Sequence, residues 1–325
     1  MHQFRRIPRD LSVPRIRSGA DLHVHTTHSD GVCSPCEVVN AAYNVGLEAL
    51  AITDHDTVSA VAVARPEAAR LGIELIAGVE WTAALDGAEI HILGHFLRDD
   101  DPAIIALCAR LRAARADRLA AVVRHLQKLG LSVDLAALAQ TFPRATLGRR
   151  HLADWLTRTG QVANIRDAFN RFLGDQGLAD VPKPRLPWRE AVSVTQAAGG
   201  VAALAHPPYR LREDVLRDLA EGGLGAIEVV GPGINANLGR RWRAWAQTLD
   251  LIPLAGSDFH ALDRPGRWVG AAATPTEDLT RLRLRARASG QTQSRTAGSA
   301  VKEPGVSKDA GLLLSVVNTD RSTNQ

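Results

Sequence analysis

Imidazole and carboxylate side chains recur in short motifs between residues 21 and 260, most of them directly after a run of apolar residues. In the first motif, Asp21-Leu22-His23-Val24-His25, the alternation of side chains along an extended strand puts both histidines on one face. Later motifs add one or two such groups each. The candidate metal ligands are His23, His25, Asp30, His55, Glu80, His91, His206, Asp258 and His260.

Nine donors exceed what one tetrahedral ion requires, so the set predicts a centre of two or three divalent metal ions. Imidazole and carboxylate ligands without thiolate suit Mn, Fe or Zn. The three cysteines do not belong to the set, and Cys33 and Cys36 form a lone CxxC at the expected start of a helix.

The elements that must position these donors follow an alternating pattern. Short apolar runs alternate with helical periodicity, which indicates a mostly parallel α/β sheet or barrel. We expect strands at 20–24, 49–53, 74–79, 89–96, 201–205, 226–230, 252–255 and 269–273. Because the carboxyl ends of barrel strands gather on one rim, motifs at those ends converge there.

Residues 99–184 break this alternation. Ile104, Leu111, Leu119 and Leu126 recur at helical spacing, and β-branched runs are nearly absent. We therefore expect a barrel formed by residues 18–98 and 185–288, interrupted by a helical insertion at 99–184 that caps the site. Residues 289–325 are poor in apolar periodicity and predict a flexible tail.

The composition narrows the class of protein. The 325 residues are 45% hydrophobic, which is enough for a large core, and the net charge of +4 does not by itself indicate nucleic-acid binding. Three cysteines exclude a disulfide framework. The first 17 residues lack the apolar region of a secretory signal, and no apolar run is long enough to span a membrane. A cytoplasmic protein without a membrane partner is expected, and no pattern indicates an oligomeric state.

Taken in order, the motifs D-x-H-x-H, S-D-G, T-D-H-D, G-x-E, H-I-L-G, A-H-P and G-S-D-x-H resemble those of the PHP (polymerase and histidinol phosphatase) family. The resemblance runs from Asp21 to His260 and implies a distorted seven-stranded β/α barrel with metals at the carboxyl rim. It implies three metal sites: one at His23, His25, Glu80 and Asp258, a second at Glu80, His91 and His206, and a third at Asp30, His55 and His260.

The insertion is similar to a bacterial branch of this family that contains AMP phosphatases, 3′,5′-bisphosphate nucleotide phosphatases and 5′→3′ exoribonucleases. This similarity implies hydrolysis of a nucleotide phosphate ester by a metal-bridging hydroxide, with short single-stranded RNA as the other substrate class. Glu80, Asp258 and His206 would hold the hydroxide. Asp54 would orient ligand imidazoles through their free N–H groups. Cations expected at the substrate phosphate are Arg149 or Arg150, His151 and Lys183.

Two other functions fit parts of the pattern. A metal hydrolase of the amidohydrolase type, cleaving C–N or C–O bonds, shares the HxH motif and the late aspartate, but no lysine lies at a strand end for carbamylation. A non-catalytic metal-binding PHP module is the third candidate, although all nine ligand positions are filled.

The insertion arginines (Arg110, Arg112, Arg115, Arg118, Arg124) either follow an RNA backbone or form an ordinary solvated helix face.

Overall fold

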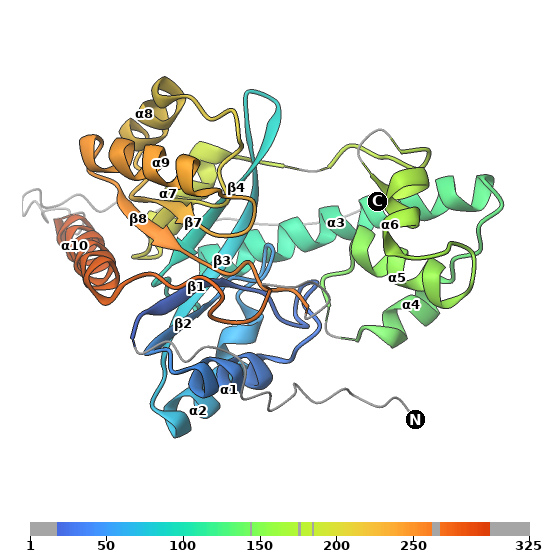
Figure 1. Ribbon diagram of the computed structural model, residues 1–325, viewed down its shortest axis with the longest axis horizontal. Coiled ribbons are helices and arrows are strands. Elements are labelled where there is room, and N and C mark those ends of the chain that lie inside the picture. The colour runs from blue at the N-terminus through green and yellow to red at the C-terminus, as the bar shows by residue number, and fades with distance from the viewer. Residues whose placement is uncertain (1–17, 144, 175–176, 184, 262–266, 300–325) are drawn as a thin grey trace, which may run out of the picture.

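A curled sheet forms the centre of the computed structural model, which describes residues 18–143, 145–174, 177–183, 185–261 and 267–299. Its main strands follow the order β1-β2-β3-β4-β6-β7-β8 (Figure 1). Val24 at the end of β1 bridges Phe259 just beyond β8, so the two edges of the sheet meet. The expected seven-stranded α/β barrel is confirmed. The strands are β1 (Ala20–Val24), β2 (Ala49–Ile52), β3 (Glu74–Leu85), β4 (Ala88–His95), β6 (Val201–Leu204), β7 (Ala226–Val230) and β8 (Ile252–Ala255).

One strand, β4, departs from the mostly parallel arrangement. β3 and β4 form an antiparallel hairpin, and β4 is also antiparallel to β6. Asp86 and Gly87 make the turn with φ of 48° and 78°. Two consecutive residues with positive φ match the twist of the flanking strands, which is why Asp-Gly favours such hairpins. β3 therefore runs six residues past its expected end at residue 79, and the short strand β5 (Leu186–Pro187) pairs with its far part.

Helices α1 (Pro35–Val45), α2 (Ser59–Leu71), α7 (Trp188–Ala197), α8 (Glu213–Glu221), α9 (Ala236–Thr248) and α10 (Thr276–Ser299) belong to the barrel. Ser34 caps α1 together with Glu37, which explains the Ser-Pro pair inside the CxxC. Cys33 is buried in the α1–α2 core, away from the ligand cluster.

Two expectations for the last part of the chain were wrong. Residues 269–273 form turns rather than a strand, and Thr274 makes only a single bridge to Ala20. Helix α10 continues to Ser299, so residues 289–299 are helical where a tail was expected. Residues 300–325 lie outside the described part of the chain.

The insertion contains α3 (Pro102–Lys128), α4 (Leu135–Thr141), α5 (Arg149–Arg158), α6 (Ile165–Ala168) and the π-helix η1 (Phe169–Leu173). Figure 1 shows α3 leading from the barrel to the other insertion helices. At 1.5 Å per residue its 27 residues span about 40 Å. Ile104 and Leu111 pack in the barrel core, whereas Leu119 and Leu126 belong to a separate core of the insertion. α3 is thus a rigid connection between two cores.

No helix within the described ranges is both long enough and apolar enough to cross a membrane.

The core of the insertion should be required for its stability. Leu126→Ala removes a fully buried side chain at the centre of that core, and we expect it to lower the free energy of unfolding by about 2–5 kcal/mol. Urea denaturation measures the change. Leu129→Ala, at a position 43% exposed, is the control and should cost about 0.5 kcal/mol or less. Equal effects of the two substitutions would contradict this assignment of the core.

Candidate metal centre

Glu80 lies at the centre of the predicted donor set. Its side chain is buried among imidazoles at one end of the barrel. Its Oε2 atom lies 3.1–3.3 Å from ring nitrogens of three histidines: His23, His25 and His55. Its Oε1 atom lies 2.6 Å from His91 Nδ1 and 2.9 Å from His206 Nε2. One carboxylate therefore faces five of the six predicted histidines.

Asp258 completes one side of the cluster. Its Oδ1 atom lies 3.5 Å from His23 Nε2 and 3.4 Å from His25 Nε2, while these two nitrogens are 3.1 Å apart. The same oxygen is 3.3 Å from His260 Nδ1.

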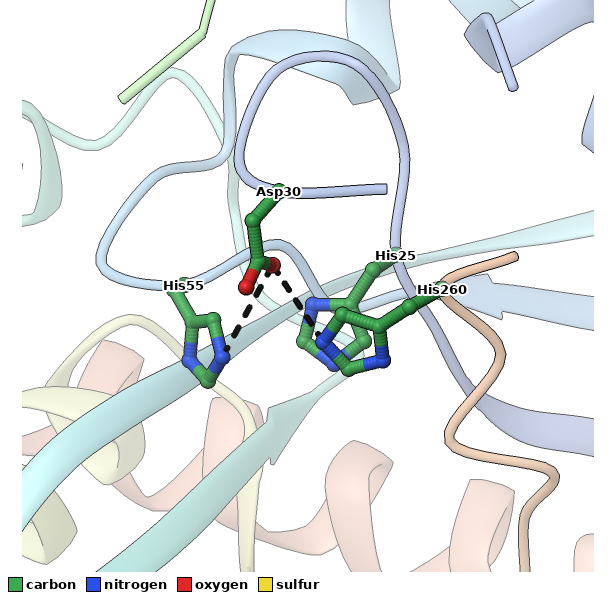
Figure 2. Close-up of side chains that lie close together, drawn as sticks. All are labelled: His25, Asp30, His55 and His260. Atoms are coloured by element: carbon green, nitrogen blue, oxygen red, sulfur yellow. Dashed lines mark ion pairs between the residues drawn. The ribbon is translucent and has the colours of Figure 1, made fainter. Parts of the chain in front are cut away.

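Asp30 faces His55 and His260, as Figure 2 shows. The loop after β1 carries Asp30 over the rim, where its Oδ1 atom lies 3.2 Å from His260 Nε2 and 3.9 Å from His55 Nε2. The rings of His25 and His260 stack with centroids 4.0 Å apart. His25, Asp30, His55 and His260 each contribute one donor atom, and these four atoms lie close enough together to bind one ion.

The structure brings all nine predicted donors together, in overlapping groups. His23, His25 and Asp258 form one group, and Asp30, His55 and His260 form another that also includes His25. Glu80 joins His23 with His206 and joins His55 with His91. His55 thus stands between the Asp30 group and Glu80, and His23 and His25 are each shared between neighbouring groups.

The hairpin explains how Glu80 and His91 reach the same rim. The sequence predicted that this strand ends at residue 79, directly before Glu80. In the structure Glu80 lies in the middle of β3. It pairs with Leu93, and Thr82 pairs with His91, so Glu80 and His91 are diagonal neighbours on one face. Because β4 runs antiparallel, its first half lies at the rim where the parallel strands end.

The backbone is strained at or near predicted ligands that follow the strands. His206, Asp258 and Asp56 have φ of 23°, 46° and 53°, in the region that L-residues rarely adopt. Such residues concentrate at functional sites, where the surrounding structure holds them. Gly256 permits the close approach beneath them, because a Cβ atom there would lie 2.4 Å from that of His23.

The donor chemistry fits divalent metal ions. Glu80 Oε2, Asp30 Oδ1 and His55 Nδ1 are buried and have no hydrogen-bond partner within the described residues. Buried polar atoms of this kind are costly unless something binds them. Glu228 Oε1 lies 3.0 Å from His23 Nδ1, while the Nε2 atom of the same ring faces Glu80 and Asp258. The site is built to bind cations.

The charges of the cluster are strongly coupled. Burial opposes the ionisation of Glu80, but the surrounding imidazoles outweigh it and hold its pKa well below the usual range. Burial also opposes the protonation of His25 and His91, but nearby carboxylates raise the pKa of His25 to about 10 and that of His91 to about 9. Burial dominates at His55 and lowers its pKa to about 3.

Glu228, on β7, was missed by the sequence reasoning. Besides facing His23, its Oε2 atom accepts a hydrogen bond from the backbone N–H of His206. It therefore supports two predicted ligands at once. Its place near the carboxyl end of a predicted strand was the signal that could have revealed it.

Asp54 acts on the site differently from what we expected. Its carboxylate accepts hydrogen bonds from the Thr26 N–H at 2.8 Å, the Thr26 hydroxyl at 2.7 Å and the Ser29 hydroxyl at 2.5 Å. It contacts no ligand imidazole in the described structure. Instead it fixes the loop that carries Asp30, while Ser29 Oγ lies 3.4 Å from His25 Nδ1.

A cavity of about 180 Å³ lies between the metal centre and the insertion. Asp30, His55 and His91 line its barrel side, and the aromatic ring of Phe169 lines its insertion side. Five cations also line it: Arg115, Arg118, Arg149, Arg150 and Lys183. Three of the predicted phosphate-binding residues therefore border the cavity.

His151 does not border it. Its ring is buried, packs against Phe142, and accepts a hydrogen bond at Nδ1 from the Gly148 N–H at the start of α5. This histidine serves the local structure of the helix N-terminus. Arg115, in contrast, was considered only as one of several insertion arginines, yet it lines the cavity.

A scan of protein families matches residues 21–159 to the PHP domain. A 5′-3′ exoribonuclease of Haemophilus influenzae is 36% identical over 246 residues, covering 74% of this chain and 89% of the relative. A 3′,5′-nucleoside bisphosphate phosphatase of Chromobacterium violaceum is 32% identical over 272 residues, covering 80% and 92%. A crystal structure from Bifidobacterium adolescentis, inferred to be of a metal-dependent phosphoesterase, superposes with a TM-score of 0.77 at 28% identity, covering 84% and 98%.

Metal binding should release protons. His25 and His91 have raised pKa values, so they are protonated near neutral pH and must lose that proton to bind an ion. The apparent affinity should therefore rise with pH up to about pH 9–10 and fall as the solution is acidified. Calorimetric titration of Mn²⁺ or Zn²⁺ in buffers of different ionisation enthalpy measures the protons released. An affinity independent of pH over this range would contradict the prediction.

Glu228→Gln should weaken metal binding without removing a predicted ligand. The substitution removes the negative charge that orients His23, and losing such a partner typically costs about 10–100-fold in affinity. Metal dissociation constants from competition with a chelator give the comparison. Glu221→Gln, at an exposed position on α8, is the matched control and should bind metal normally. Identical constants for the two variants would exclude a supporting role for Glu228.

Proposed function

The chain belongs to the PHP domain family, and on this premise we propose that it is a metal-dependent phosphoesterase acting on nucleotides. One observation carries the proposal: a cluster of nine histidine, aspartate and glutamate donors borders, through Asp30, His55 and His91, a cavity that lysine and arginine side chains also line. The histidine and carboxylate donors suit divalent cations, and the lysine and arginine side chains suit a phosphate group.

We assign all nine predicted donors to metal binding, with two or three ions of Mn, Fe or Zn. Glu80 would be the ligand shared between ions, since its two oxygens face different histidines. When bound, such ions neutralise the negative charge of a phosphate ester and increase the acidity of water. Asp258 and His206 hold strained backbone positions in the same donor cluster as Glu80.

The cations of the insertion provide the substrate contacts in this proposal. Arg149 and Arg150 begin helix α5 at the cavity wall, and Arg149 Nη1 donates to the Leu173 carbonyl at 2.8 Å. Lys183 pairs with Glu89 at the opposite edge, so its ammonium is held in place beside the cavity. Guanidinium and ammonium groups around a phosphate stabilise the charge that builds up on its oxygens during hydrolysis.

A small nucleotide is the substrate class that we favour, either AMP or a 3′,5′-bisphosphate. The cavity is small, and Phe169 is the aromatic ring available in its wall. The insertion arginines do not form a continuous track: Arg110 pairs with Glu190, while Arg115 and Arg118 face inward. Short RNA presenting a terminal phosphate is the second candidate, favoured by the similarity to the Haemophilus influenzae exoribonuclease.

The two other functions receive less support. A carbamylated-lysine centre is not available, because the lysines of the described ranges are Lys128 near the end of α3 and Lys183, which pairs with Glu89. A non-catalytic metal-binding protein would not need a cavity lined by lysine and arginine side chains beside a complete set of nine candidate ligands.

Substitution of a predicted ligand should abolish the activity. We expect His23→Ala and Asp258→Ala to reduce metal-dependent phosphate release from AMP or adenosine 3′,5′-bisphosphate by at least about 100-fold. His125→Ala, on α3 outside the cavity, is the control and should remain active.

The substrates are separated by a panel measured under each metal: AMP, adenosine 3′,5′-bisphosphate, a 5′-phosphorylated oligoribonucleotide and a lactam. Preferred turnover of the oligonucleotide, with strong salt dependence, would support the RNA alternative. Turnover of the lactam alone would indicate an amidohydrolase. A metal-loaded protein inert toward every ester would refute the proposed function.

A further inference from the structure

Arg115 connects the insertion to the metal centre through a fixed set of hydrogen bonds. It lies at the middle of α3, between the part of this helix in the barrel core and the part in the insertion core. Its Nε donates to Asp56 Oδ2 at 2.7 Å, and its Nη2 donates to Thr82 Oγ1 at 2.6 Å. Thr82 belongs to β3, two residues beyond Glu80. The guanidinium is therefore bound to the strand that carries the central carboxylate.

Asp56 is itself held firmly. Its Oδ1 accepts the Thr82 N–H at 2.9 Å, and its Oδ2 accepts the Thr82 hydroxyl at 3.1 Å together with the Arg115 guanidinium. The residue adopts a positive φ of 53°, and its carboxylate is buried. A guanidinium is planar, so fixing two of its nitrogens fixes the direction of the third.

That third nitrogen, Nη1, has no hydrogen bond within the described residues, although the side chain is only 24% exposed. Arg115 lines the cavity together with Asp30, His55 and His91. Two N–H donors are thus available in a cavity that is bordered by the metal centre. Asp56 keeps the guanidinium in place, so little entropy is lost when an anion binds to it.

We propose that Arg115 binds an oxygen of the substrate phosphate through Nη1, and that Asp56 is a positioning residue that sets the direction of this donor. The inference rests on the proposed function and adds a phosphate contact that the sequence motifs of the insertion did not indicate. Arg115 is better prepared for this contact than an arginine on a loop, because a long helix and a barrel strand hold it on two sides.

The test compares Arg115→Gln and Arg115→Lys with the wild-type protein and with Arg124→Gln, an exposed arginine on the same helix. Three quantities are measured on the metal-loaded protein: bound metal by elemental analysis, the affinity for orthophosphate from ligand-dependent thermal shifts, and kcat/KM with AMP or adenosine 3′,5′-bisphosphate. We expect Arg115→Gln to retain its metal, to bind orthophosphate at least about 10-fold more weakly and to lose about 100-fold in kcat/KM. Arg124→Gln should match the wild type in all three.

Asp56→Asn separates positioning from contact. It leaves the Arg115 charge in the cavity but weakens its anchor, so we expect a smaller loss of orthophosphate affinity than in Arg115→Gln, with a clear fall in kcat. Should Arg115→Gln not fold, Arg115→Lys carries the test, since it keeps a charge near Asp56 but lacks the planar fork, and it should also bind orthophosphate more weakly.

Unchanged orthophosphate affinity in a folded, metal-loaded Arg115 variant would overturn the inference. A loss of metal in parallel with the loss of affinity would do the same, because it would show that Arg115 only supports the metal centre. A wild-type protein that binds orthophosphate through Arg115 but hydrolyses none of the panel would instead refute the proposed function. The two failures are therefore distinguishable.

Discussion

The buried carboxylate of Glu80 imposes the constraint on which the site depends. An isolated carboxylate in a barrel interior would be strongly destabilising. Here its two oxygens lie within 3.3 Å of five imidazole nitrogens, and protonated rings such as those of His25 and His91 hold it ionised. One of these oxygens still has no hydrogen bond in the described structure. A bound cation would satisfy that oxygen and the crowded ring nitrogens together.

Several parts of the barrel hold Glu80 and the neighbouring donors in position. A twelve-residue β3 holds it mid-strand rather than on a loop, and the hairpin with β4 sets His91 diagonally across from it. Gly256 allows the end of β8 to approach His23, and Glu228 from β7 orients the same ring. These supports explain why ligands separated by more than two hundred residues meet within a few ångströms.

The insertion depends on the same rim for its position. α3 packs into both cores, the Asp56–Arg115 pair ties its middle to β3, and the Thr146 N–H donates to the His28 carbonyl on the loop before Asp30. Lys183 and Glu89 form another contact at the edge of the hairpin. The cavity is therefore built from both parts, with the anionic donors on the barrel side and the cations on the insertion side.

The sequence by itself determined the positions of the seven strands, the helical insertion and the nine donors that the structure assembles, because strand periodicity, helix periodicity and chemically distinctive side chains are local properties of a chain. It did not determine that β4 runs antiparallel, because pairing direction depends on which strands are adjacent. Nor did it distinguish His151, buried at a helix cap, from Arg115, which lines the cavity. The direction of a side chain is set by packing between distant segments, and only the tertiary structure decided it.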